Sequence, residues 1–473
     1  MLSSGISFPE TLAVVMVAAV CVTLMAGYPV ALTLGGVSLV FAFLGDMLGI
    51  FPISLLFALP PRVFGVVAND VLIAIPLFVF MGVMLERSCI AEDLLETMGR
   101  LFGHLRGGLG IAVLFVGVLL AAAKGIVGAT TVTMGLIVLP TMLRHGYDKR
   151  LAAGTVAATA TLAQIFPPAT VLVLLGDQMS NAYQAAQLAQ GTFSPQTVTV
   201  SDLFAGAIVP AFGLVLLYLV FLVATAIIWP ASSPAIEPEA DASHGFALAR
   251  RLVAAMIAPL ALIFAVLGSI LAGIATPSES ASIGAVGAIL LALGRGERRA
   301  SWTGEVLVPV LHRTAQIVAM IFLILIGATL FSLVFRGFGG DDLVNRALTN
   351  LPGGTAGAVL TVMAAMFLLG FVMDAFEIIF VVVPIVAPVL LKMPGIDPVW
   401  LGVMMAMNLQ MSYMHPPLGP TLFYLRGVAP KEITTAHIYV GIIPFVLIQM
   451  VALVALWFLP DLATWLPHSL YGG

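Results

Sequence analysis

Two proline pairs interrupt apolar stretches of this sequence, at Pro167–Pro168 and Pro416–Pro417. Proline removes a backbone donor and clashes with the preceding turn, so a helix that contains such a pair is broken there. Within a bilayer, the freed backbone groups persist only where they line a cavity enclosed by protein. Two such breaks in matching positions of two halves indicate the binding site of a secondary transporter. Amide groups at the N-termini of the half-helices would suit a carboxylate, and unwound carbonyls would suit Na⁺.

Polar side chains accompany both breaks and would supply further ligands. Those preceding the two pairs are Thr161, Gln164, Asn408, Gln410, Ser412 and His415. Two other apolar stretches carry polar residues at their midpoints: Lys124, Gly125, Gly128, Thr130 and Thr131 within 108–142, and Asp374 and Glu377 within 355–391. Ionisable residues at membrane depth are costly and usually functional. These residues and the four prolines form the candidate substrate or ion site.

Several of these assignments have a structural alternative. Small and hydroxyl residues also let membrane helices pack closely. Lys124 could attract a substrate carboxylate or stand in place of a sodium ion, or it could extend to the cytoplasmic interface. Asp374 and Glu377 are three residues apart, so they could share one helix face or bond the neighbouring backbone. His415 could titrate during transport or be held by a hydrogen bond in packing.

The composition is that of a polytopic membrane protein. Of the 473 residues, 61% are hydrophobic and 9% are charged, whereas soluble proteins carry about 25% charged residues. The net charge of −4 gives no reason to expect nucleic-acid binding, and the two cysteines form no readable disulfide framework or zinc motif. The first apolar stretch lacks a basic leader, so we expect it to remain in the mature protein as the first helix.

No pattern of catalytic residues is found in the sequence. The seven histidines are scattered, and neither a His/Cys/Asp/Glu cluster with metal-ligand spacing nor a P-loop occurs. We therefore expect neither an enzyme nor a cofactor. Transport would draw on an ion gradient or on the gradient of the substrate itself.

Apolar segments recur along the chain and predict an all-α polytopic fold. Full spans are expected at 10–26, 29–45, 71–85, 151–175, 202–228, 252–273, 280–294, 314–335, 399–425 and 437–458. The stretches at about 108–142 and 355–391 are each long enough for two short helices, and we interpret them as re-entrant hairpins. The spans 151–175 and 399–425 contain the proline pairs, and we interpret them as broken helices.

The two halves repeat the order of hairpin, polar connector and broken helix. The expected divisions are N-terminal scaffold helices with an outer segment at 1–70, a first repeat at 71–228, a cytoplasmic linker at 229–251, a second repeat at 252–458 and a periplasmic tail at 459–473. We expect the first hairpin to open inward and the second to open outward. This inverted-repeat organisation supports alternating access.

Basic residues indicate the orientation. With the N-terminus outside, 14 of the 19 Lys and Arg residues lie in inner loops and 4 in outer segments, with Lys124 in the membrane. This distribution follows the positive-inside rule. We therefore expect both termini on the outer side.

Several stretches together resemble the large membrane subunit of tripartite ATP-independent periplasmic (TRAP) transporters. They are residues 27–35, 75–82, 86–95, 125–128, 273–279, 374–388 and 415–427. The motifs Phe-Glu-Ile-Ile at 376–379 and Leu-Phe-Tyr-Leu-Arg-Gly at 422–427 are similar to those of the family branch labelled mannitol/chloroaromatic. This branch also includes 2-oxo-acid systems. The resemblance covers nearly the whole chain, in order.

The resemblance implies a permease of the bacterial inner membrane with an inverted-repeat, elevator-type fold like that of the ion-transporter superfamily. The outer side, where the charge distribution places both termini, would then be the periplasm. The partners of the permease would be a small four-helix membrane subunit and a periplasmic substrate-binding protein that delivers a small carboxylate. Import would be driven by an ion gradient, usually of Na⁺, through an elevator motion of the hairpins and broken helices. Ion sites are implied at the hairpin tips and the facing broken helices, here near Gly128, Thr161, Asp374 and Ser412.

The sequence departs from the family pattern at the implied ion site. Lys124 stands where relatives usually carry a small hydroxyl residue, Ala169 replaces a usual Ser, and residues 158–164 replace a Gly-rich, Ser-containing run. Bulk and positive charge at an ion site disfavour Na⁺. We hypothesise that Lys124 substitutes for one sodium ion.

Two alternative functions stay open at this point. One is a stand-alone elevator-type anion transporter that needs no binding protein. The other is a membrane enzyme acting on lipid-linked substrates, which would require a polar cluster with metal or nucleophile geometry facing a lateral opening to lipid.

Overall fold

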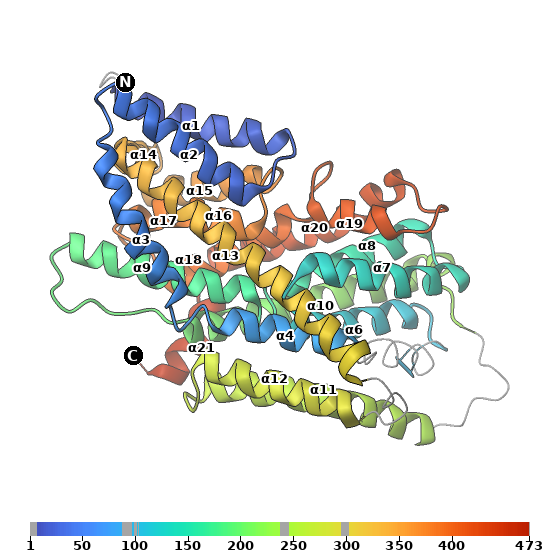
Figure 1. Ribbon diagram of the computed structural model, residues 1–473. Coiled ribbons are helices and arrows are strands. Elements are labelled where there is room, and N and C mark those ends of the chain that lie inside the picture. Colours follow the sequence, from blue (N-terminus) through green and yellow to red (C-terminus); the bar gives the residue numbers. More distant parts are fainter. Residues whose placement is uncertain are drawn as a thin grey trace. The chain divides into compact units, whose positions relative to one another are not determined.

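The computed structural model describes residues 7–87, 97–98, 102, 104–236, 246–294 and 302–472. Within these ranges the chain is helical and contains no strand (Figure 1). The fold class predicted from the sequence is confirmed, because the described helices include two hairpins and two helices broken at the proline pairs. The predicted linker 229–251 is covered only in part, since 237–245 lie outside the described residues.

Seven of the described helices are long and apolar enough to cross a bilayer, by length and composition. They are Phe8–Met25, Val30–Met47, Val127–Arg144, Val200–Ile228, Pro277–Gly294, Glu305–Gly337 and Thr435–Phe458. Val127–Arg144 is the returning helix of the predicted first hairpin, and the others coincide with predicted spans. The longest of these segments, Glu305–Gly337, has 33 residues. At 1.5 Å per residue its length exceeds the thickness of a hydrocarbon core, about 30 Å.

The chain divides in space into two compact units, each built from three separated stretches. The first unit contains Met1–Leu72, Leu174–Thr199 and Gln316–Gly402, and the second contains Ile73–Val173, Val200–Ala315 and Val403–Gly473. Helices α9 (Thr170–Ala189), α13 (Val308–Gly337) and α18 (Pro398–Ser412) pass from one unit to the other. The second hairpin therefore belongs to the first unit, and both proline pairs belong to the second.

The second unit holds the first hairpin and the broken-helix loops. Its helices are α4 (Ala74–Arg87), α6 (Gly108–Lys124), α7 (Val127–Arg144), α8 (Lys149–Thr161), η2 (Leu162–Gln164), α10 (Val200–Ile228), η3 (Pro230–Ser232), α11 (Phe246–Leu271), α12 (Pro277–Gly294), η5 (Trp302–Leu307), α19 (Pro420–Val428), α20 (Thr435–Phe458) and α21 (Asp461–Tyr471). Helix α21 occupies the segment that the sequence suggested was a tail, and it packs on α10.

Small residues let the helices of the second unit approach closely. Helix α8 is buried from Leu151 to Thr161 and contacts α6, α7 and α20. A Cβ atom added to its Gly154 would lie 2.0 Å from the carbonyl oxygen of Gly441 in α20. Glycine at both positions thus allows backbone-to-backbone contact, as small residues do at helix interfaces in membranes.

The first unit holds the N-terminal helices and the second hairpin. Its further helices are α1 (Phe8–Met25), α2 (Val30–Met47), η1 (Ile53–Ala58), α3 (Leu59–Val67), α14 (Gly340–Thr349), α15 (Gly354–Leu369), α16 (Ala375–Val381) and α17 (Val383–Leu390). The returning limb of the hairpin is split into α16 and α17, where the sequence suggested one helix. Pro384 follows this junction directly, and proline cannot donate the helical hydrogen bond expected there.

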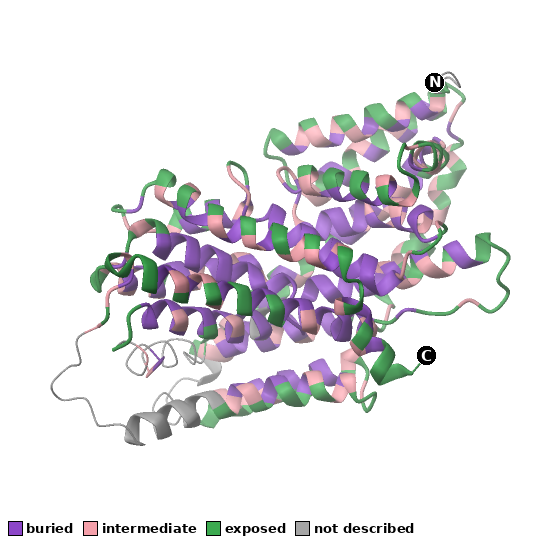
Figure 2. Cartoon of the chain, turned by 180° about the vertical axis from the view of Figure 1, so that it is seen from behind, coloured by how far each residue is buried: buried purple, intermediate pink, exposed green. Residues whose placement is uncertain are grey.

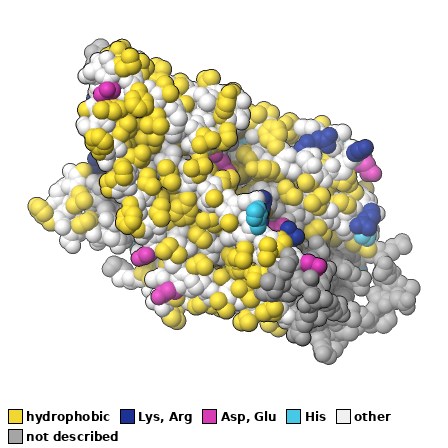
Figure 3. Space-filling view, in the orientation of Figure 1, with side chains coloured by type: hydrophobic (Ala, Val, Ile, Leu, Met, Phe, Trp, Pro, Cys, Tyr) yellow, Lys and Arg dark blue, Asp and Glu magenta, His cyan; other side chains and the backbone are white. Residues whose placement is uncertain are grey.

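Helix α1 shows how the outer helices of the first unit are patterned. Its buried residues recur every three or four positions (Glu10, Ala13, Met16, Val20 and Leu24). Most other residues of α1 are intermediate or exposed (Figure 2). Hydrophobic side chains cover the visible face of α1 and α2 (Figure 3). Such an apolar surface is the one expected of helices that face lipid.

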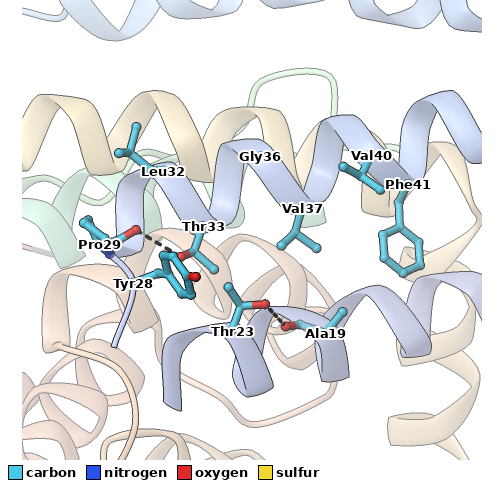
Figure 4. Close-up of a pocket in the computed structure, with 10 residues that line it drawn as sticks. All are labelled: Ala19, Thr23, Tyr28, Pro29, Leu32, Thr33, Gly36, Val37, Val40 and Phe41. Carbon is cyan, nitrogen blue, oxygen red and sulfur yellow. Dashed lines mark hydrogen bonds between the residues drawn. The ribbon is translucent and has the colours of Figure 1, made fainter. Parts of the chain in front are cut away.

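A groove of about 500 Å³ lies between α1 and α2 (Figure 4). It is lined mainly by apolar residues. The hydroxyls of its two threonines, Thr23 and Thr33, donate to the carbonyl oxygens of Ala19 and Pro29 at 2.7 and 3.0 Å. Because these hydroxyl protons are already used within each helix, the groove is poorly suited to a charged solute.

Candidate substrate and ion site

The tip of the first hairpin lies against the first proline pair, inside the second unit. Helix α6 ends at Lys124, Gly125 takes a left-handed conformation with φ of 60°, and α7 begins at Val127. A Cβ atom on Gly125 would lie 3.1 Å from both the backbone N and Oγ1 of Thr170, and 3.5 Å from the carbonyl oxygen of Pro168. Glycine at the tip therefore satisfies both the backbone angle and the close approach.

The returning helix of the same hairpin packs beside the second break. A Cβ atom on Gly128 would lie 3.2 Å from the ring of Tyr424, and one on Gly135 would lie 2.6 Å from Val428. Tyr424 and Val428 belong to α19, which follows the second proline pair. The first hairpin thus contacts elements next to both breaks.

The two breaks also contact each other. Thr161 Oγ1 donates to the carbonyl oxygen of Ala158 at 2.8 Å and lies 3.3 Å from Met414 Sδ. Both Pro167–Pro168 and Pro416–Pro417 have cis peptide bonds. The short helix η2, which ends at Gln164, contacts both helices of the first hairpin. The hairpin and both proline pairs, predicted from the sequence as one site, are therefore gathered in one unit.

Four neutral side chains beside the breaks carry buried polar atoms that no described residue bonds. We call them the break quartet: Gln164, Thr170, Gln410 and Thr421. The atoms are Gln164 Oε1, Thr170 Oγ1, Thr421 Oγ1 and both Oε1 and Nε2 of Gln410. Gln164 is 2% exposed and the other three are 0% exposed. A buried polar atom without a partner costs about 1–3 kcal/mol, so these atoms suggest a bound ligand or ordered water.

The hydroxyls of the other predicted residues in this unit are bonded within their own helices. Thr130 and Thr131 donate to the carbonyl oxygens of Ile126 and Val127 at 2.9 and 2.8 Å. Ser412 donates to the carbonyl oxygen of Leu409 at 2.7 Å. A hydroxyl that donates keeps its lone pairs, so these oxygens are still available to a cation. Asn408 is also buried on this segment, and His415 lies next to the second proline pair.

Asp374 and Glu377 lie in the first unit and form a capping box at the start of α16. The Asp374 carboxylate accepts from the backbone N–H of Ala375, and Glu377 Oε2 accepts from the backbone N–H of Asp374 at 2.9 Å. These bonds satisfy orphan amides of the first turn. Both carboxylates thus have a local structural role, and their role at an ion site stays a prediction.

Lys124 ends α6, but its side chain lies outside the part of the chain that the structure describes. Among the described residues, no group of three or more His, Cys, Asp and Glu is arranged to hold a metal ion. The oxygen atoms gathered at the breaks are therefore mainly neutral hydroxyl, amide and carbonyl oxygens.

The profile of the family described as "Tripartite ATP-independent periplasmic transporter, DctM component" matches residues 16–462. The chain belongs to this family. This DctM-family chain is thus a transporter permease and not an enzyme, and the family resemblance noted in the sequence is confirmed.

Curated relatives are also named as TRAP transporter permeases. The C4-dicarboxylate permease DctM of Rhodobacter capsulatus is 28% identical over 83% of this chain and 86% of its own length. The 2,3-diketo-L-gulonate permease YiaN of Escherichia coli is 25% identical over 81% and 84%. The isethionate permease DctMQ of Oleidesulfovibrio alaskensis is 26% identical over 81% of this chain but 56% of its own length.

A solved structure shares the fold of this DctM-family permease. The YdaH transporter of Alcanivorax borkumensis has a TM-score of 0.60 and 15% identity, and the match covers 97% of this chain and 100% of that one. At this identity the likeness concerns the fold alone. Its description as a transporter of unusual topology fits the helical hairpins and broken helices seen here.

Sequence reasoning missed two members of the break quartet, Thr170 and Thr421. Each stands in the first turn of the helix that follows a proline pair, in α9 and α19 respectively. The sequence search considered polar residues before each pair and not those after it. A symmetric search for hydroxyl residues at the N-terminus of the second half-helix would have found both.

Proposed function

We propose that this permease imports a small carboxylate across the bacterial inner membrane as part of a secondary-active TRAP transporter. The observation that carries the proposal is the gathering of the first hairpin tip, both proline-pair loops and the break quartet in one unit. Such a cluster of backbone and neutral side-chain groups at helix breaks suits an anion and its coupling cation.

The substrate class is supported by two arguments. Helices α9 and α19 begin directly after the proline pairs, and helix N-termini favour anions such as carboxylates. The named substrates of the relatives include C4-dicarboxylates, 2,3-diketo-L-gulonate and isethionate, which are organic anions.

The coupling ion in this proposal is Na⁺. Hydroxyl and carbonyl oxygens near Gly128, Thr161 and Ser412 are ligands that suit a hard cation. No nucleotide-binding motif is present in the sequence, so the energy would come from an ion gradient. The hairpins and broken helices would move as an elevator, which is how many inverted-repeat transporters alternate access.

The partners in this proposal are a small four-helix membrane subunit and a periplasmic binding protein. The family description names a tripartite transporter, of which DctM is one component. One relative is a single permease protein named DctMQ, a name that joins DctM with a second component, Q. The excess of basic residues in the inner loops, 14 against 4, supports periplasmic termini.

Reconstitution into proteoliposomes tests the proposal. We expect uptake of a radiolabelled carboxylate that requires an inward Na⁺ gradient, the small subunit and the binding protein together. Uptake without any binding protein would instead favour a stand-alone anion transporter. Uptake that is the same with and without an ion gradient would contradict secondary-active import.

A further inference from the structure

The break quartet repeats the same pair of residue types around both proline pairs. Gln164 precedes the first pair and Thr170 follows it, while Gln410 precedes the second and Thr421 follows it. All four side chains are at least 98% buried, and each has at least one polar atom that no described residue bonds. All four also lie in the second unit.

Backbone contacts place the quartet at the breaks themselves. The Thr170 hydroxyl lies beside the hairpin tip, since a Cβ atom on Gly125 would be 3.1 Å from it. The backbone N–H of Thr421 donates to the carbonyl oxygen of Tyr413 at 3.2 Å, so α19 starts against the end of the preceding segment. Gln410 lies in the last turn of α18.

The hydrogen-bond inventory of the quartet distinguishes between substrate groups. A threonine hydroxyl and the Gln410 amide NH₂ can donate to a carboxylate, which accepts hydrogen bonds and donates none. The Gln164 and Gln410 carbonyl oxygens are acceptors, so they need a donor. A second carboxylate would present lone pairs to these oxygens, whereas a hydroxyl group both donates and accepts.

We infer that the break quartet recognises a hydroxyl group of the substrate, so that this permease selects hydroxycarboxylates over their deoxy analogues. The inference rests on the proposed function and adds the substrate class. Ordered water would satisfy the quartet when no substrate is bound. A deoxy analogue would leave unpaired the glutamine oxygen that accepts the hydroxyl proton, and a site built to bond a hydroxyl rejects such an analogue strongly.

The test measures binding to the purified complex of the two membrane subunits, which removes the selectivity of the binding protein. Thermal-shift titrations compare matched pairs that differ by one hydroxyl group: L-malate with succinate, L-lactate with propionate, and (R)-3-hydroxybutyrate with butyrate. For at least one pair we expect the hydroxy acid to bind about ten- to hundredfold more tightly, from the loss of one buried hydrogen bond.

The variants Gln410→Met and Gln164→Met remove the acceptors with little change in side-chain volume. We expect each to reduce the hydroxy-to-deoxy preference to about threefold or less, mainly by weakening binding of the hydroxy acid. The matched control is Gln449→Met. Gln449 lies in α20, is 2% exposed and is not part of the break quartet. The Gln449→Met variant therefore makes the same buried exchange outside the quartet and should keep the wild-type preference.

The outcomes separate this inference from the proposed function. Equal binding of both members of every pair would overturn the inference and leave carboxylate transport standing. A Gln410→Met variant that changes the Na⁺ dependence but keeps the hydroxy-to-deoxy preference would also overturn the inference, because Gln410 would then bind the cation and not the substrate hydroxyl. A complex that binds none of the six acids would also overturn the inference, whereas the proposed function is tested separately by uptake through the complete transporter with its binding protein.

Discussion

The Oγ1 atom of Thr161 lies 3.3 Å from the Sδ atom of Met414, and the two residues are 253 positions apart in the chain. Each stands shortly before a proline pair, and both side chains are fully buried. The contact joins the two broken helices at their interruptions within one unit. The two breaks are therefore in direct contact.

Shortening Met414 to alanine should loosen this junction. The change removes buried volume beside Thr161 and should destabilise the protein by about 2–5 kcal/mol. Met414→Leu keeps the volume and should cost less than about 1.5 kcal/mol. Thermal unfolding of the purified protein in detergent measures both. Equal unfolding temperatures for the alanine and leucine variants would show that the contact contributes little.

A methyl group on Gly125 should impair the hairpin tip. Gly125 has φ of 60°, and its Cβ would lie 3.1 Å from Thr170 N, so Gly125→Ala should cost about 1–2 kcal/mol from the left-handed backbone alone. We expect a lower unfolding temperature and slower uptake. Gly213→Ala in α10 is the control, since no heavy atom lies within 4 Å of its added Cβ. Comparable losses in both variants would argue against a special role of the tip.

The sequence predicted the features that depend on local chemistry. Proline pairs and polar residues inside apolar stretches identified both breaks and both hairpins, because these residue types disrupt helices wherever they stand. The Asp-x-x-Glu spacing at 374–377 also predicted, as one alternative, that the two carboxylates bond the neighbouring backbone. The capping box at the start of α16 shows these bonds. The site roles of these carboxylates remain to be measured.

Features that depend on distant contacts could not be predicted in this way. That Gln410 and Thr421 lack described partners follows from which helices surround them, and one sequence does not show that. The approach of Gly154 to Gly441 is likewise a contact between segments nearly 300 residues apart along the chain. The division of α16 from α17 was missed because Pro384 was read as part of a continuous limb.

Neutralising Asp374 should change the Na⁺ dependence of uptake more than the stability of the folded protein. Asparagine caps a helix about as well as aspartate, so Asp374→Asn should preserve the start of α16. If its carboxylate contributes to an ion site, the Na⁺ concentration for half-maximal uptake should rise by about tenfold, because the variant loses a charge near the cation. Glu377→Gln, which also preserves the capping box, is the matched comparison; an equal rise in this variant would assign the effect to both carboxylates rather than to Asp374. An unaltered Na⁺ dependence in Asp374→Asn would leave Asp374 with its capping role alone.

Asp341 should make stability depend on pH. Burial raises the pKa of its carboxyl group above the usual value, Arg336 at 3.1 Å opposes this rise, and nearby Asp342 adds to it. The native state then holds the proton to a higher pH than the unfolded chain, so its stabilising contribution is lost as pH rises above about 4. The unfolding temperature of the wild type should fall with pH relative to Asp341→Asn. Asp461→Asn, at an exposed position, is the control and should follow the wild type; parallel curves for all three proteins would refute the prediction.

Replacing Lys124 by serine should increase the number of sodium ions carried with each substrate. Lys124 ends α6 beside the tip at Gly125, where a fixed positive charge would repel a cation. A serine hydroxyl supplies an oxygen ligand instead, so the variant should take up additional Na⁺ per carboxylate. Parallel uptake of ²²Na⁺ and labelled substrate into proteoliposomes measures the ratio, with Lys431→Ser in an exposed loop as the control. The same ratio in wild type and Lys124→Ser would rule out the hypothesis that the lysine takes the place of a sodium ion.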